Sequence, residues 1–275
     1  MQAFSIGRVF SRAFGLIRDT IGTAGLFVFL LLVVETVVSV VAQPIMLESM
    51  QNAVAAADSP DQRSNAALAI FESVWYWALL LTGFVATCLA WSGGLHGLLQ
   101  YAERGETSLA ECFQRGLTRF LPVLALTVLW WLGFMLGWMV LIVPAAILAS
   151  MWAVALPAML AEGLGVFAAF GRSRELTRGN RLSIFGVLVL LIVIYYVLAM
   201  VIAGSMMGAG AFSGALAGEA ALEAMGSISP WLALAALPFS WASGMLLKAM
   251  VASLYLESVL VKEGVRTDQL TDVFG

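Results

Sequence analysis

The sequence predicts an all-α polytopic membrane protein with six transmembrane helices and three amphipathic helices on the cytoplasmic face. Three observations support this fold class. The chain is 61% hydrophobic and only 11% charged, whereas soluble domains are about 25% charged. Its long apolar segments provide six stretches of the roughly 20 residues that a helix needs to cross the hydrocarbon layer. Twelve of the 14 lysines and arginines fall in four clusters between those segments.

The basic clusters determine the expected topology. They lie at residues 8–18, 104–119, 172–181 and 262–266. The long segments between them contain only Arg63 and Lys248 as basic residues. Because positively charged loops remain on the cytoplasmic side during insertion, all four clusters should lie on that side. An even number of crossings then separates neighbouring clusters, and both termini are expected in the cytoplasm. The expected outer segments are 45–72, a tight turn near 143, and 208–230.

The apolar segments give the positions of the crossings. We expect spans at about 21–44, 73–100, 120–140, 143–161, 184–207 and 231–261. The stretch from 120 to 161 is too long for one crossing and suits two. Its turn should fall between Gly137 and Pro144, since glycine and proline permit a sharp reversal. The longest polar stretches are about 25 residues, too short to form a core. We therefore expect residues 1–275 to form one integral membrane domain.

Three basic segments have the apolar periodicity of helices that lie in the headgroup region. The predicted apolar faces are Ile6, Val9, Phe10, Ala13, Phe14 and Ile17 in the first; Leu109, Cys112, Phe113, Gly116, Leu117 and Phe120 in the second; and Val166, Ala169, Phe170, Ser173 and Leu176 in the third. Ser108 and Glu111 have the spacing of a capping box, which predicts the start of the second helix.

The arginines of these segments are predicted to bind anionic lipid headgroups. They are Arg8, Arg12, Arg18, Arg115, Arg119, Arg172, Arg174, Arg178 and Arg181. The cytoplasmic leaflet carries anionic lipids, which attract basic residues near its surface. No basic patch is large enough to favour a nucleic acid as partner. Membrane lipids are therefore the expected partners.

Ionisable residues inside the spans are candidate functional residues, because a charge at mid-bilayer is expensive. Glu35 and Lys248 lie near mid-depth on the first and last spans. They fit either an ion-coupling or gating pair, or a salt bridge that holds the helices together. His96, near the cytoplasmic end of the second span, fits either a proton relay or a polar anchor. Glu257 is expected to reach headgroup water and Lys262, without a special role.

The sequence provides few groups for catalysis. It has a single histidine, no set of histidine, acid and serine, and no glycine-rich phosphate loop followed by lysine. The two cysteines, Cys88 and Cys112, are expected at different depths and should not pair. Metal-ligand spacing is absent. We therefore expect no enzyme activity, no metal site and no cofactor.

One part of the chain resembles a known family. The residues are Ala161 to Gly165, Ala169, Phe170, Arg172, Ser173, the run Glu175 to Arg181, Ile184 and Phe185, with Pro144 and Pro157 before them. They resemble a bacterial family of multi-helix membrane proteins, similar to the membrane domain of some glycerophosphoryl diester phosphodiesterases. The match is best from Pro144 to Phe185. The resemblance implies a six-helix fold in a bacterial inner membrane. Members that hydrolyse phosphodiesters carry a separate soluble domain, which this sequence does not contain, so that activity is not expected.

The motif that carries the resemblance also has a physical interpretation. Its polar and glycine positions are Glu162, Glu175, Thr177, Gly179 and Asn180. Glu175 is three residues from both Arg172 and Arg178, a spacing that permits an ion pair on a helix. Gly179 and Asn180 can end the third amphipathic helix before the fifth span. These roles concern packing and topology rather than catalysis.

Two classes of function follow from these features. The first is a non-enzymatic membrane protein that organises or binds lipids or partner proteins at the inner membrane. The alternative is a transporter or channel for a small or lipid-like solute, which would use Glu35, Lys248 and the glycine-rich helices. A transporter should contain a polar cavity at mid-membrane, whereas a lipid or protein organiser should have a packed or lipid-filled centre.

Overall fold

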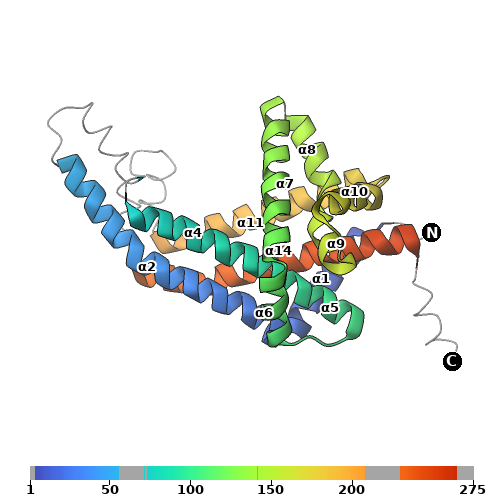
Figure 1. The fold of residues 1–275 in the computed structure, drawn as a ribbon, viewed down its shortest axis with the longest axis horizontal. Helices are drawn as coiled ribbons and strands as arrows, with labels where there is room; N and C mark the ends of the chain where they lie inside the picture. The colour runs from blue at the N-terminus through green and yellow to red at the C-terminus, as the bar shows by residue number, and fades with distance from the viewer. Residues whose placement is uncertain (1–3, 56–70, 72, 141, 208–229, 265–275) are drawn as a thin grey trace. The chain divides into compact units, whose positions relative to one another are not determined.

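The computed structural model describes residues 4–55, 71, 73–140, 142–207 and 230–264. Within these ranges the chain is helical and contains no strand. Six helices are long and apolar enough to cross a membrane (Figure 1). The predicted all-α polytopic fold is therefore confirmed. Arg63, Arg266 and most of the two long outer segments lie outside the described residues.

The first amphipathic segment and the first span form one continuous helical run. Helix α1 (Ile6–Thr20) passes through a π-helical turn, η1 (Ile21–Gly25), into α2 (Leu26–Ala55). A π turn inserts extra residues and so rotates the faces of the helix on either side of it. The chain can therefore change from the amphipathic helix α1 to the apolar helix α2 without an intervening loop.

The second span has the same construction. Helix α4 (Val74–Leu89) passes through the π turn η3 (Ala90–Gly94) into α5 (Leu95–Arg104). Gly105 ends α5 with a φ of 76°, a left-handed conformation that favours glycine. The amphipathic helix α6 (Leu109–Thr118) follows. Ser108 and Glu111 form the predicted capping box at its start.

The third and fourth spans form a hairpin. They are α7 (Phe120–Val140), then α8 (Ile142–Met151) and α9 (Ala155–Glu162), which are separated by a break at 152–154. The predicted turn between Gly137 and Pro144 is confirmed. A Cβ atom at Gly133 would lie 2.3 Å from the Trp152 ring, and one at Gly137 would lie 3.0 Å from Ala145 Cα. The two legs thus pack at a separation that only small residues permit.

Three helices complete the described chain. They are α10 (Val166–Thr177), α11 (Arg181–Met207) and α14 (Pro230–Glu263). In α14, 56% of the most apolar window is buried, against at most 44% in the other candidate spans. A membrane helix that is buried to this extent packs against protein more than against lipid. The described buried residues of α14 lie between Met245 and Ser258, in its second half.

The contacts divide the chain into two compact units. Unit 1 comprises Met1–Val28, Cys88–Ile194 and Ser243–Gly275, and unit 2 comprises Phe29–Thr87 and Tyr195–Ala242. Unit 1 contains all three amphipathic helices and the second half of α14. Unit 2 contains most of α2 and α4, the end of α11 and the start of α14. Each unit is described on its own below.

In unit 1, α6 packs directly against the π turn η3. A Cβ atom at Gly93 would lie 2.3 Å from the backbone oxygen of Cys112, and one at Gly97 would lie 2.7 Å from Cys112 Sγ. Ser92 in the π turn donates a hydrogen bond of 3.0 Å to the carbonyl of Gly116. These glycines bring two backbones into contact, which fixes α6 on the second span.

Two of the predicted apolar faces are only partly correct. In α6 the buried residues are Cys112 and Gly116, whereas Phe113 and Leu117 are exposed. In α1 the buried face is Val9, Ala13, Leu16 and Thr20, and Ile6 and Phe14 are exposed. In α6 the physical reason is that the small residues Cys112 and Gly116 face the backbone of η3, so the larger Phe113 and Leu117 point away from it. In α1 the buried face is rotated from the predicted one towards Leu16 and Thr20.

Helix α10 packs against the break between α8 and α9, with residues of its predicted face. Ala169, Ser173 and Leu176 are buried. Ser173 Oγ donates to the carbonyl oxygen of Met151 at 2.8 Å, and Thr177 Oγ1 lies 3.4 Å from the same oxygen. Helix α8 ends at Met151, so this carbonyl is one that a helix end leaves without an intrahelical partner. The hydroxyls of α10 thereby complete the fourth span.

Candidate functional site

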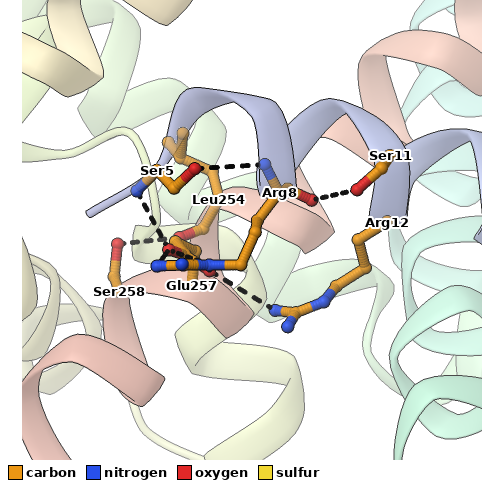
Figure 2. Close-up of polar contacts among 7 residues, drawn as sticks. All are labelled: Ser5, Arg8, Ser11, Arg12, Leu254, Glu257 and Ser258. Atoms are coloured by element: carbon orange, nitrogen blue, oxygen red, sulfur yellow. Dashed lines mark hydrogen bonds and ion pairs between the residues drawn. The ribbon is translucent and has the colours of Figure 1, made fainter. Parts of the chain in front are cut away.

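A buried carboxylate on α14 anchors the start of the chain. The Glu257 side chain is fully buried, and it lies beside two arginines of α1 (Figure 2). Arg8 donates from Nη2 at 2.6 Å and from Nε at 3.0 Å to Glu257 Oε1. Arg12 Nη1 lies 4.0 Å from Oε2, and the backbone N–H of Ser5 donates to Oε1 at 3.1 Å. We call these residues the Glu257 cluster.

The Glu257 cluster corrects one sequence interpretation. Glu257 was expected to reach headgroup water and Lys262, but its side chain has no exposed surface. A buried carboxylate is tolerated when ion pairs and hydrogen bonds compensate the lost hydration, and here two arginines and a backbone amide do so. Arg8 and Arg12, two of the predicted headgroup residues, are therefore committed at least in part to a carboxylate of their own protein.

A second cluster is centred on Arg172 of α10. Its guanidinium pairs with Glu162 at 2.9 Å, with Glu175 at 3.6 Å, and with Glu263 at the end of α14. Tyr255 of α14 donates its hydroxyl to Glu162 at 3.0 Å. We call these residues the Arg172 cluster. Of the two arginines that the spacing places within reach of Glu175, Arg172 forms the ion pair.

The Arg172 guanidinium is held in its charged form. Burial by itself would lower its pKa, but hydrogen bonds to Glu263 and then Glu162 raise the pKa above its ordinary value. Three carboxylates share one cation, so the cluster carries more negative than positive charge. Arg172 therefore has little remaining capacity to bind an anionic headgroup.

The rest of the resemblance motif acts at helix ends. Gly179 has a φ of 94°, in the left-handed region that favours glycine. The N–H of Asn180 donates to the carbonyl of Thr177 at 3.1 Å, and the carbonyl of Asn180 accepts from Ile184 at 3.0 Å. Gly179 and Asn180 thus end α10 and lead into α11, as predicted.

A third group of charges surrounds His96 in α5. This half-buried histidine lies within electrostatic range of Arg115, Glu111, Arg104 and Arg119. Within the described ranges, none of the three arginines forms an ion pair. We call the three arginines and His96 the His96 cluster. Glu111 also acts on His96, and two further acids, Glu103 and Glu106, flank Arg104 in the sequence.

The three arginines of this cluster come from adjacent elements. Arg104 ends α5, Arg115 lies in the last turn of α6, and Arg119 is the residue that follows α6. A guanidinium nitrogen of Arg119 lies 3.7 Å from the position that a Cβ at Gly163 would occupy. Arg104 was missing from the predicted headgroup set. Its membership of the 104–119 basic cluster was the signal that could have identified it.

The remaining predicted headgroup residues are spread over α1, α10 and the start of α11. Arg18, Arg174 and Arg178 are exposed, and none of them forms an ion pair with a described residue. The Nε atom of Arg181 is buried and has no hydrogen-bond partner. The structure does not gather these four side chains into a described cluster.

Lys248 is almost fully buried in unit 1. Its ammonium lies 4.9 Å from the centre of the Trp91 ring and donates to the Gly244 carbonyl at 3.3 Å. Gly94 leaves room for the chain, since a Cβ there would lie 3.4 Å from Lys248 Cδ. The ring and the carbonyl supply the negative potential that a buried cation requires.

Glu35 lies in unit 2, against α4. Its Oε1 atom lies 3.3 Å from the position that a Cβ at Gly83 would occupy. Glu35 forms no ion pair with any residue that the structure describes. Glu35 and Lys248 belong to different units, and each has neighbours within its own unit. The pair predicted between them stays a prediction.

The described residues contain no group of three or more His, Cys, Asp or Glu side chains that could hold a metal ion. Cys88 and Cys112 are both buried and free, and burial raises the pKa of the Cys112 thiol. Comparison of the chain with protein-family models, with curated proteins and with solved structures finds no match. The resemblance to the phosphodiesterase-associated membrane family therefore stays a prediction.

Proposed function

We propose that the protein is a non-enzymatic integral membrane protein that binds anionic lipid headgroups through the His96 cluster, on the cytoplasmic side of a bacterial inner membrane. One observation carries the proposal. Arg104, Arg115 and Arg119 all act electrostatically on one histidine, and none of them forms an ion pair with a described residue. Neighbouring cations repel one another, and a phosphate placed between them relieves that repulsion.

The chemistry of the guanidinium group supports a phosphate ligand. Arginine presents a planar fork of donors that matches two phosphate oxygens, and it is less strongly hydrated than lysine. By contrast, Arg8 and Arg172 already use their donors on carboxylates of the protein. Of the nine predicted headgroup residues, the proposal keeps Arg115 and Arg119, and it adds Arg104.

The neighbouring apolar side chains favour a lipid over a soluble phosphate. Phe113 and Leu117 are exposed on α6, the helix that also carries Arg115. A short helix with cationic and apolar side chains side by side can bind a headgroup and its acyl chain together. The ligand class is therefore a membrane lipid with an anionic phosphate headgroup.

The proposal is tested by binding of phosphatidylglycerol to the full chain in nanodiscs, measured by native mass spectrometry. A hydrogen bond from each arginine of the site to the bound phosphate contributes about 1 kcal/mol net. The variant R104Q/R115Q/R119Q should therefore lose affinity by about 100-fold. The matched control R18Q/R174Q/R178Q removes the same charge from exposed positions and should lose much less. Equal losses in the two variants would contradict a specific site, and displacement by inorganic phosphate alone would contradict a lipid ligand.

A transporter or channel for a small or lipid-like solute is the second candidate. Glu35 favours it, because this acid lies in a span without an ion pair among the described residues. Solute uptake or lipid transfer in reconstituted vesicles would support this candidate if Glu35→Gln abolished it and R104Q/R115Q/R119Q retained it.

A further inference from the structure

In unit 2, the lack of a side chain at Gly83 makes room for the carboxyl group of Glu35. A Cβ atom at Gly83 would lie 3.3 Å from Glu35 Oε1 and 3.9 Å from Glu35 Cδ. The carboxyl therefore lies directly against the backbone of α4. Any residue other than glycine would press on it. Glu35 and Gly83 thus form a small recess between two apolar helices, which we call the Gly83 recess.

The carboxyl cannot easily reach water along its own helix. Glu35 lies 14 residues after Ile21 and nine before Pro44, the ends of the expected span. At about 1.5 Å per residue, these separations correspond to roughly 21 Å and 14 Å. A glutamate side chain is far shorter than either distance. The carboxyl group therefore stays at the depth of the hydrocarbon layer.

The hydroxyl groups beside these residues in sequence are occupied elsewhere. Thr36, next to Glu35, donates to the carbonyl of Leu32 at 2.8 Å. Thr82, next to Gly83, donates to the carbonyl of Ala78 at 2.6 Å. Both hydroxyls thus bond to their own helices. Neither supplies the hydrogen bonds that would stabilise a carboxylate.

Unit 2 also provides little charge to balance Glu35. The only basic residue in its sequence is Arg63, which lies outside the described ranges. The other described titratable groups of the unit are Glu48, Tyr76, Tyr195 and Tyr196. Among the described residues of unit 2, none forms an ion pair with Glu35. An isolated carboxylate at this depth is costly, whereas the neutral acid is much less so.

We propose that Glu35, seated in the Gly83 recess, is a reversible proton-binding site inside the membrane. A carboxylate oxygen of Glu35 forms an O–H bond with one proton, and the same bond breaks when the proton leaves. No oxidant, reductant or leaving group takes part. The side chain is half-buried within the protein, and exchange of the proton at this depth requires transient entry of water. The site is independent of the His96 cluster, which belongs to unit 1.

The test uses the full chain in membranes and dicyclohexylcarbodiimide, an apolar reagent that modifies protonated carboxyl groups. The acid adds across a C=N bond of the reagent, and the O-acylisourea that forms rearranges to a stable N-acylurea. Mass spectrometry should find one reagent molecule on the peptide that contains Glu35. The modified fraction should rise as the pH falls from about 9 to 5, and Glu35→Gln should abolish it.

Three comparisons make the result specific. Glu257, which is paired with Arg8, should remain unmodified. The variant R104Q/R115Q/R119Q should be modified like the wild type, so a failure of headgroup binding leaves this inference intact. Gly83→Val fills the recess and pushes the carboxyl towards lipid, so Glu35 should react several-fold faster with the apolar reagent.

Three outcomes would overturn the inference. The first is no modification of Glu35 at any pH, and the second is modification that does not depend on pH. The third is protection of Glu35 by sodium ions at constant pH, which would indicate a metal cation as the ligand in place of a proton. An unchanged rate in Gly83→Val would show that the recess does not position the carboxyl.

Discussion

The Glu257 and Arg172 clusters both join the second half of α14 to other helices, but they solve opposite electrostatic problems. In the first, one fully buried acid is shared by two arginines of α1 whose side chains are 42% and 34% exposed. In the second, one arginine that is 21% exposed is shared by three acids, which are 26%, 41% and 72% exposed. Each central residue thus has two or three partners of opposite charge. The difference is that water reaches the central residue of the Arg172 cluster but not Glu257.

This difference determines what each cluster contributes. If an arginine leaves Glu257, water cannot replace it, so the protein retains an uncompensated buried charge. If a glutamate leaves Arg172, water can hydrate both groups, and the loss is small. The Glu257 cluster should therefore contribute most to the stability of α1 on α14, whereas the ion pairs of the Arg172 cluster should stabilise α10 more weakly.

The largest expected effect comes from Arg8→Met. This change removes the closest partner of Glu257 and leaves Arg12 at 4.0 Å as the other arginine of the cluster. An unpaired buried carboxylate costs on the order of 3 kcal/mol. The variant should unfold at a clearly lower SDS fraction than the wild type in mixed micelles.

A double mutant distinguishes charge from packing at this site. Glu257→Gln in the Arg8→Met background removes the buried charge, so it should restore most of the lost stability. If the double mutant were as unstable as Arg8→Met alone, the electrostatic account of the Glu257 cluster would be wrong.

Arg172→Met should have an intermediate effect. It breaks three ion pairs at once, but all three carboxylates are partly exposed and can be hydrated. We expect a loss of about 1–2 kcal/mol in the same SDS titration. Tyr255 still donates a hydrogen bond to Glu162 in this variant, which limits the loss of stability. A loss larger than that of Arg8→Met would reverse the proposed ranking of the two clusters.

Glu175→Gln should have the smallest effect. The pair with Arg172 is a surface contact three residues apart on one helix, with a glutamate that is 72% exposed. Such pairs contribute about 0.3 kcal/mol and are screened by salt. The variant and the wild type should therefore become indistinguishable when unfolding is repeated at high ionic strength. A difference that persisted in salt would mean that Glu175 has a role beyond this pair.

Most of the fold could be predicted because it depends on local signals. Hydrophobic runs of sufficient length give the six helices, and the spacing of Ser108 and Glu111 gives the capping box. Gly179 could be assigned to a helix end, since few other residues adopt its backbone conformation. The pair of Arg172 with Glu175 could be predicted because both residues lie on one helix.

The features that could not be predicted depend on contacts between distant residues. Glu257 and Arg8 are 249 residues apart, and no local pattern assigns one to the other. The π turns η1 and η3 have no signature in hydrophobic periodicity. The buried face of α6 was misjudged because side-chain size, rather than hydrophobicity, decides which face meets the backbone of η3. The buried face of α1 was misjudged because it depends on which distant helix packs against it. Arg8, Arg12 and Glu257 were, however, expected on the same side of the membrane. Their opposite charges could have indicated that they form ion pairs.

The carbonyl of Met151 makes the order of synthesis matter for this protein. Its hydroxyl donors, Ser173 and Thr177, come 22 and 26 residues later in the chain. A nascent chain that has just inserted α8 and α9 therefore holds an unsatisfied acceptor at the end of α8. That acceptor gains its protein donors only when α10 folds back onto it. The fourth crossing is thus completed from a part of the polypeptide that is made after it.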